Sequence, residues 1–406
     1  MLLIFIFFPF LAFLFSLKDL RKQQNAIIFI AFYALFGYAN HFALKTADIS
    51  RIAYVFQFYD KYFDPINFLE PFLSGASADV YKNIIMSIVW HFTDNPKVFC
   101  GAIALVYGFL SYAVYVKVYE LWGRKYDKYF YIYILICLSN ISLVQLTGMR
   151  FFTGALLFIL SAYNYIMGEK KWIIGIILAP FCHFALWMGL AGFLIYLLGK
   201  NCILRRKLCK IMLLLCFAFS FVNLGGISKK YLQQMNVENR AFNTKAGAYM
   251  HEDSELQESD MSGKSAYRQA NMMFTSFFEI VCRAGLVIIL IKLLNRQRQL
   301  IQSSKMKKFF AFCFLFSCMS VFAVGISDDI KRFICISWCL VLLYVAYLCG
   351  RNLNFNIRKY ESLIFFSNFY WVCYLFINAP RLVDVSLWFL PVPYIILDGI
   401  GFRITW

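Results

Sequence analysis

The sequence predicts an all-α fold, a polytopic integral membrane bundle of about 12–13 spanning helices. Two observations lead to this fold class. The 406-residue chain is 61% hydrophobic and only 15% charged, a balance typical of apolar spans joined by short connectors. Its basic residues also gather in alternate connectors, as the positive-inside rule describes. We therefore expect one transmembrane domain over residues 1–406, and topology explains most of the net charge of +18 without nucleic-acid binding.

The expected spans are apolar runs near the length of about 20 residues that a crossing helix needs. They lie near residues 1–16, 26–40, 98–116, 129–146, 150–167, 172–198, 211–224, 272–293, 309–326, 333–349, 362–378 and 386–400. The first run has no basic region before it and no small-residue cleavage site, which favours a span over a signal peptide.

The orientation of the chain follows from its basic connectors. Stretches rich in Lys and Arg lie near residues 18–22, 117–128, 170–171, 200–210, 292–308, 351–359 and 403. The positive-inside rule places these connectors in the cytoplasm. We therefore expect the N-terminus outside and the C-terminus in the cytoplasm.

This alternation requires that the run Trp172–Leu198 does not cross the membrane as one helix. A single crossing would put the basic stretch 200–210 outside. A break near Pro180–His183 restores the rule, and Pro180 favours a break because proline lacks a backbone donor and disfavours helix at Ala179. Non-helical backbone at membrane depth must be buried in protein or line a wet cavity, so we expect His183 to face an internal cavity. The sequence therefore predicts a broken or re-entrant helix pair near 172–198.

Two longer segments are expected outside. The first covers residues 41–97 and contains Val80–Phe92, whose apolar residues recur at helical spacing, as in a helix lying at the membrane interface. The second covers residues 225–270 and is polar, with Arg240 within it. Its stretch Glu252–Lys264 is rich in Ser, Asp and Glu, which predicts mobility.

Familiar catalytic motifs are missing from the sequence. It has no Walker loop, no GxSxG elbow and no dinucleotide-binding glycine pattern, which disfavours ATP-driven transport and serine hydrolysis. Its 13 cysteines form no CxxC pair, and no two of its four histidines share metal-ligand spacing. We therefore expect no metal and no cofactor. The histidines all map to the outer side or to the break, which suggests outward-facing acid–base chemistry.

Several arginines abut or enter apolar runs, where a cation is costly and usually functional. Arg150 and Arg332 each open a span at its outer boundary. A guanidinium binds phosphate with two parallel hydrogen bonds, which suits a lipid-linked diphosphate. The alternatives for each are contact with lipid headgroups or a pair with a nearby Asp. Arg283 is better explained by an i, i+4 pair with Glu279.

At this point the sequence resembles a known family. The stretch Gly148–Ala155 (GMRFFTGA), a basic turn at residues 169–171 and Ala179–Leu186 (APFCHFAL) are together similar to the EpsG family, which belongs with the Wzy-type polysaccharide polymerases. Asp48–Tyr54 (DISRIAY) resembles that family's acidic residue followed by tyrosine, and Asp329–Phe333 (DIKRF) resembles its late arginine. The glutamate-proline element of the family has only Glu70-Pro71 as its nearest match, and no Ser or Thr follows His183.

The resemblance implies a glycosyltransferase in the bacterial cytoplasmic membrane, with its site facing outward. It would transfer a glycan from undecaprenyl diphosphate to a lipid-linked acceptor unit, in exopolysaccharide, capsule or O-antigen synthesis, alongside a flippase and a chain-length regulator. It would need no metal if guanidiniums stabilise the diphosphate, and a single displacement would invert the anomeric centre. The implied catalytic residues are His183, Asp48 and Arg150, and the implied diphosphate- and glycan-binding residues are Arg51, Arg150, Arg332, Arg240 and Arg381. His183 could act as a general base or as a hydrogen-bond donor to the diphosphate.

Two other classes fit part of the pattern. A flippase for a lipid-linked oligosaccharide would also have about a dozen spans, but such carriers usually consist of two related halves and none are found here. A membrane acyltransferase that modifies the glycan would need a His-centred site, for which His183 is the only support.

Overall fold

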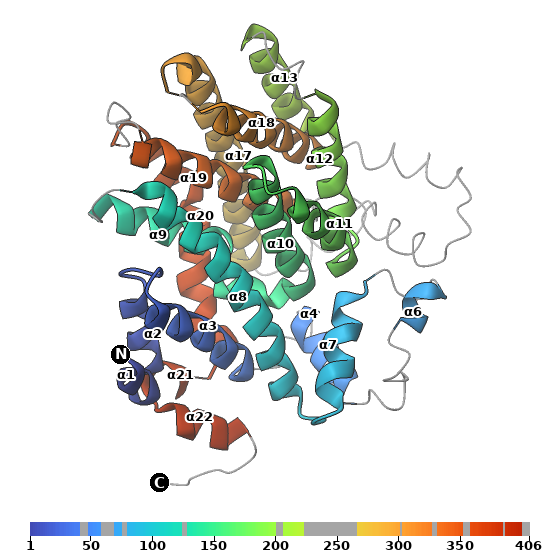
Figure 1. The fold of residues 1–406 in the computed structure, drawn as a ribbon, viewed down its shortest axis with the longest axis vertical. Coiled ribbons are helices and arrows are strands. Elements are labelled where there is room, and N and C mark those ends of the chain that lie inside the picture. Colours follow the sequence, from blue (N-terminus) through green and yellow to red (C-terminus); the bar gives the residue numbers. More distant parts are fainter. Residues whose placement is uncertain are drawn as a thin grey trace.

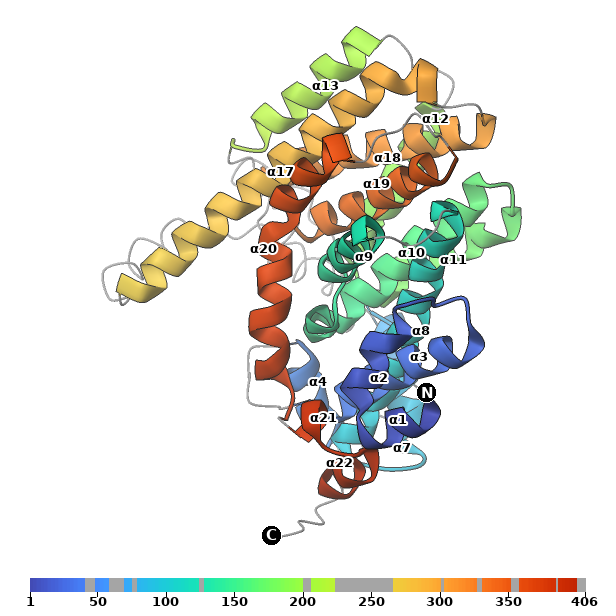
Figure 2. The ribbon, with the colours of Figure 1, turned by 90° about the vertical axis from the view of Figure 1, so that its left-hand side faces the viewer.

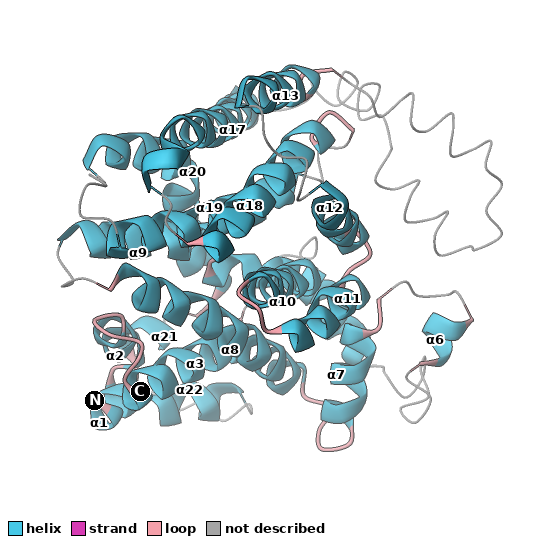
Figure 3. Cartoon of the chain, turned by 45° about the horizontal axis from the view of Figure 1, so that its top comes forward, coloured by secondary structure: helices cyan, strands magenta, loops and turns pink. Residues whose placement is uncertain are grey.

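The computed structural model describes residues 1–40, 48–57, 69–74, 79–123, 128–199, 206–222, 266–300, 303–326, 331–351, 358–384 and 386–399. About 86% of it is helical and the described residues form no strand (Figure 3). A single antiparallel bridge joins Asn40 to Val383 in this part of the chain. The all-α expectation is therefore confirmed.

Within the described residues, five helical stretches are long and apolar enough to cross a membrane. They are α8 (Pro96–Trp122), the run Lys128–Ile166, α18 (Ser304–Ala323), α19 (Arg332–Arg351) and α20 (Arg358–Leu382). The second stretch comprises α9 (Lys128–Asn140), a 3-10 helix η1 (Leu143–Gly148) and α10 (Met149–Ile166). These helices indicate a membrane protein, and the total number of spans and their orientation stay predictions.

The other described helices are shorter or less apolar. They are α1 (Leu2–Phe7), α2 (Pro9–Ser16), α3 (Gln23–Tyr38), α4 (Asp48–Phe56), α6 (Glu70–Leu73), α7 (Tyr81–Trp90), α11 (Ile173–Cys182), α12 (Leu186–Gly199), α13 (Arg206–Phe219), α17 (Ala266–Leu300), α21 (Ser386–Phe389) and α22 (Val392–Gly399). Helix α7 confirms the helix expected within residues 80–92. In Figure 1, α8 runs from α7 at one end to α9 at the other, and Figure 2 shows α13 beside α17, with which it is in contact.

Helix α19 lies at the centre of the bundle. The apolar segment of α19 is 89% buried inside the protein. The helix packs against α8, α9 and α18. A helix that is covered on all sides is expected to be apolar all round rather than amphipathic. Its Trp338 is fully buried, and the indole N–H donates to the carbonyl of Cys282 in α17 at 3.2 Å.

Several basic connectors gather at one end of the bundle. The Tyr119 hydroxyl at the end of α8 donates to the carbonyl of Leu17 between α2 and α3 at 2.5 Å. At the same end of α8, Gly350 of α19 touches the carbonyls of Leu121 and Trp122 so closely that a Cβ there would clash. Connectors that the charge pattern assigned to the cytoplasm are therefore neighbours in space.

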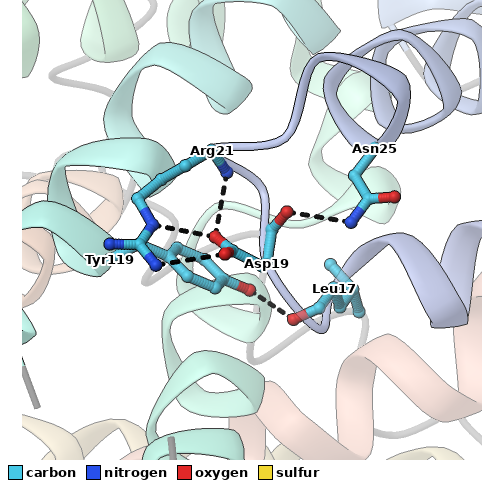
Figure 4. Close-up of polar contacts among 5 residues, drawn as sticks. All are labelled: Leu17, Asp19, Arg21, Asn25 and Tyr119. Atoms are coloured by element: carbon cyan, nitrogen blue, oxygen red, sulfur yellow. Dashed lines mark hydrogen bonds and ion pairs between the residues drawn. The ribbon is translucent and has the colours of Figure 1, made fainter. Parts of the chain in front are cut away.

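The first of these connectors is itself ordered by charge (Figure 4). The Asp19 carboxylate accepts from Arg21 Nε at 2.9 Å and from Arg21 Nη2 at 3.0 Å, while its backbone carbonyl accepts from Asn25 at 2.9 Å. The hydrogen bonds from Arg21 lower the pKa of Asp19 below its ordinary value, because they favour the charged carboxylate.

The run 172–198 is broken, as predicted, but the break is later than Pro180. Helix α11 continues through Pro180 to Cys182, and His183 is extended, with φ −158° and ψ 130°. A turn then leads into α12 at Leu186. Pro180 cannot donate to the Ile176 carbonyl and its ring crowds that carbonyl, which weakens the helix, and α11 ends two residues later, after Cys182.

The last apolar run differs from the span expected over residues 386–400. It forms α21 and α22, which are separated around Pro391 and pack against α2 and α1. Eight residues of helix extend only about 12 Å, so α22 is too short to cross a membrane. The Tyr38 hydroxyl donates to the carbonyl of Ile396 at 3.0 Å, which holds α22 beside the end of α3. Proline explains the difference, because Pro391 interrupts the helical hydrogen bonding.

Candidate functional site

The break between α11 and α12 is held by the residues that precede α7. The Val80 N–H donates to the carbonyl of Phe181 at 2.9 Å, before the break. The Asp79 carboxylate accepts from the Phe184 N–H at 3.0 Å, after the break. Figure 3 shows α7 beside α11, in agreement with these contacts. A segment about 100 residues earlier in the sequence thus fixes both sides of His183.

Arg150 forms an ion pair with Asp79 through Nη1 and Oδ2. The Asp79 side chain is 1% exposed and that of Arg150 is 12% exposed, so this pair is buried. Arg150 owes its place to η1, whose capping box between Ser142 and Gln145 begins the turn that leads into α10. Of the roles that the sequence left open for Arg150, pairing with an Asp is the one found here.

His183 lies in this buried region, where it is 5% exposed. Its imidazole meets the Phe151 ring edge to face, with ring centroids 5.6 Å apart. Its Nδ1 accepts a hydrogen bond from the Ala185 N–H at 3.2 Å. His183 is therefore buried at a break in the helix, and the expectation that it faces an internal cavity stays a prediction.

Arg332 reaches the same aromatic ring from α19. Its guanidinium carbon lies 5.9 Å from the Phe151 ring centroid, a cation–π arrangement. The ring of the next residue, Phe333, also packs on Phe151 at 5.3 Å. Phe151 thus contacts both Arg332 and His183, although these residues come from sequence stretches about 150 residues apart.

Arg332 also lines a cavity of about 190 Å³ between α17, α19 and α20. The lining residues are Glu279, Cys282, Arg283, Lys331, Arg332, Ile334 and Trp371. Three of these side chains are cationic and one is a carboxylate. The cavity is large enough to hold several water molecules, at about 30 Å³ for each.

The contacts of two cavity residues differ from the expected pair of Glu279 with Arg283. Glu279 Oε2 lies 2.7 Å from Lys331 Nζ, at the start of α19. Arg283 is 7% exposed, and its Nη1 donates to Ser220 Oγ at 3.2 Å and to the Ser220 carbonyl at 3.3 Å. The guanidinium carbon also lies 5.2 Å from the Phe221 ring centroid. Packing of α13 against α17 supplies these partners, which spacing within one helix does not reveal.

The other predicted site residues lie elsewhere or outside the described residues. Arg51 is exposed on α4 and lines a separate cavity of about 610 Å³ with Tyr54, Gln57 and Pro96. Arg381 is exposed near the end of α20. Asp48 begins α4, but its side chain is outside the described part of the chain, as are all of Arg240, His41, His251 and residues 252–264.

Two residues of this site were not predicted from the sequence. Asp79 was not singled out, although its place directly before the helix expected over Val80–Phe92 is typical of a residue that binds backbone N–H groups. Lys331 precedes the arginine that was singled out. Among the described residues, no group of three His, Cys, Asp or Glu side chains is placed to hold a metal ion.

Comparisons with known proteins do not identify a family for this chain. No protein-family model matches the sequence, and neither the curated proteins nor the solved structures that were compared with it gave a match. The functional argument therefore depends on the residues of this site.

Proposed function

We propose that this protein is a polysaccharide polymerase that works at the outer face of the bacterial cytoplasmic membrane. It transfers a growing glycan from undecaprenyl diphosphate to a lipid-linked acceptor repeat unit. The observation that carries the proposal is that Arg332 and His183 both contact the ring of Phe151, which directly follows Arg150 of the Asp79–Arg150 pair. These residues come from four separate stretches of the chain, and three of them were expected at the site from the sequence.

The cationic cavity supports a diphosphate leaving group. Arg283, Lys331, Arg332 and Glu279 all line it, so its lining carries two more positive charges than negative ones. A low-dielectric site strengthens the attraction between fixed cations and a developing oxyanion, and the cations need no reorganisation as the reaction proceeds. Because Arg150 is paired with Asp79 and Lys331 with Glu279, we assign the stabilisation of the diphosphate to Arg332, with Arg283 beside it.

The reaction is a single displacement at the anomeric carbon of the donor glycan. The acceptor hydroxyl oxygen forms a bond to this carbon while the bond from the carbon to the diphosphate oxygen breaks. The hydroxyl proton passes to a general base, for which the sequence offers His183 and Asp48, and the negative charge that develops on the diphosphate is balanced by the cations of the cavity. A single displacement inverts the configuration of the anomeric carbon. A flippase that delivers the lipid-linked units and a regulator of chain length are the partners such a reaction implies.

The purified protein provides the test. In nanodiscs it is expected to lengthen a lipid-diphosphate-linked repeat unit without nucleotide sugar, ATP or divalent cation, because the cations of the cavity supply the charge that a metal would otherwise supply. Product length is measured by mass spectrometry of the released glycan.

A matched pair of variants controls for the loss of positive charge. Arg332→Gln removes a guanidinium from the cavity and is expected to abolish most lengthening. Arg21→Gln removes one from the exposed connector at the opposite end and is expected to have no effect. Lack of product with wild-type protein and correct substrate would overturn the proposal, and acyl transfer to the glycan would favour the acyltransferase instead.

A further inference from the structure

The proposed reaction leaves one buried charged residue without a chemical role, namely Asp79. Its side chain is 1% exposed, and its two carboxylate oxygens have different partners. Oδ2 pairs with Arg150 of α10, and Oδ1 accepts from the Phe184 N–H at 3.0 Å. A buried carboxylate with a charged partner and a backbone donor is held in one orientation, since losing either contact leaves a polar group unsatisfied.

The contacts of Asp79 are placed so that they fix the backbone around His183. Phe181 is tied to Val80 on one side and Phe184 is tied to Asp79 on the other, so the extended residue between them cannot move independently of α7. The extended backbone of His183 brings its ring back towards the following turn, where Nδ1 meets the Ala185 N–H at 3.2 Å. Through these backbone contacts Asp79 constrains where the imidazole can lie.

The hydrogen bond from the Ala185 N–H also determines which ring nitrogen of His183 carries the proton. A backbone N–H can donate only to a nitrogen that has a free lone pair, so Nδ1 of His183 is unprotonated in this arrangement. The proton of the neutral imidazole is then on Nε2, which makes Nε2 a donor. A general base would need its unprotonated nitrogen for the acceptor hydroxyl, and here that nitrogen is already an acceptor for Ala185.

We propose that Asp79 is a positioning residue that holds Nδ1 of His183 against the Ala185 N–H, so that His183 acts through its Nε2–H as a hydrogen-bond donor to a phosphate oxygen and not as a general base. The identity of the phosphate group rests on the proposed function, whereas the positioning and the tautomer do not. The cavity cations and the imidazole then act together on the leaving group, and the proton of the acceptor hydroxyl goes to a carboxylate base, for which the sequence offers Asp48.

The tautomer is tested without any activity measurement. The chain has four histidines, so the ¹⁵N signals of His183 in labelled protein are assigned by their loss in His183→Gln. At a pH where the ring is neutral, Nδ1 is expected to give the signal of an unprotonated nitrogen and Nε2 that of a protonated one. Asp79→Ala removes the acceptor of the Phe184 N–H and is expected to convert this single tautomer into a mixture, whereas Asp19→Ala at the opposite end is expected to leave it unchanged. A protonated Nδ1 in the wild type, or an unchanged spectrum in Asp79→Ala, would overturn the proposal.

Activity then separates donor from base. Glutamine can place a carboxamide NH₂ near the position of Nε2, but it cannot accept a proton at neutral pH. His183→Gln is therefore expected to stay within about tenfold of wild type, while His183→Ala loses about 10²–10³-fold, the effect of removing one oxyanion donor. Equal losses in the two variants, with both proteins monodisperse, would refute the donor role. An inactive wild type would instead count against the proposed function and would leave the NMR result to decide the positioning.

Discussion

Asp79→Asn is the substitution that most directly tests how this site is built. Asparagine keeps the volume of Asp79 and an oxygen for the Phe184 N–H, so the change removes mainly the charge opposite Arg150. With 1% and 12% of the two side chains exposed, the Arg150 guanidinium would be left buried without its counter-charge. Breaking a buried pair in this way costs about 3–5 kcal/mol of the free energy of unfolding.

A double-mutant cycle isolates the pair itself. Arg150→Gln leaves the Asp79 carboxylate uncompensated and is expected to destabilise by a similar amount. The double variant Asp79→Asn/Arg150→Gln leaves no buried charge, so its loss should be well below the sum of the two single losses. Equilibrium unfolding in mixed micelles, followed by tryptophan fluorescence, measures the free energy of unfolding of the wild type and of the three variants.

The exposed pair Asp19–Arg21 is the matched control for this cycle. Its side chains are 18% and 48% exposed, and pairs of this kind contribute about 0–1 kcal/mol. If the losses of Asp79→Asn and Arg150→Gln simply add, or if each is as small as the loss of Asp19→Asn, the buried ion pair does not hold α7 to α10 and the reasoning is refuted.

Three further predictions concern topology, chemistry and pH. In intact cells, after removal of the native cysteines, an impermeant thiol reagent should label Glu70→Cys but not Lys207→Cys, and the reverse would contradict the topology. Arg332→Lys should reduce glycan lengthening about 10²–10³-fold, because lysine lacks the planar guanidinium that can donate two parallel hydrogen bonds to a phosphate. An unchanged rate would exclude such bidentate binding by Arg332. Because Arg21 lowers the pKa of Asp19, this carboxylate stabilises the folded state at pH values above 3.8, the ordinary pKa of the group. The stabilisation is lost as the pH falls through the lowered pKa. The stability difference between wild type and Asp19→Asn should therefore vanish in acid, and a constant difference would contradict the pairing.

Much of the fold could be predicted because it follows from local chemistry. Apolar runs, basic connectors and one proline were enough to expect a helical bundle with His183 at a break, and α7 and the start of α10 lie where the pattern indicated. The positive-inside rule was informative because it requires a break within the apolar run 172–198, which hydropathy alone does not reveal.

The contacts within the site could not be predicted in the same way. Asp79 and Arg150 are 71 residues apart, and no periodicity relates them. Glu279 pairs with Lys331, because the packing of α17 and α19 supplies a partner that competes with the i, i+4 neighbour. The run over residues 386–400 is apolar enough to suggest a span, and Pro391, around which the helix is interrupted, was the signal in the sequence that this expectation overlooked.

The central claim is that this protein forms glycosidic bonds and does not carry its substrate across the membrane. Proteoliposomes that contain fluorescent lipid-diphosphate-linked repeat units allow both processes to be measured in one sample, by glycan length and by quenching of the label from outside. We predict longer glycans with no protein-dependent increase in translocation, and loss of the longer products in Arg332→Gln. Protein-dependent translocation of units that never lengthen would contradict the account.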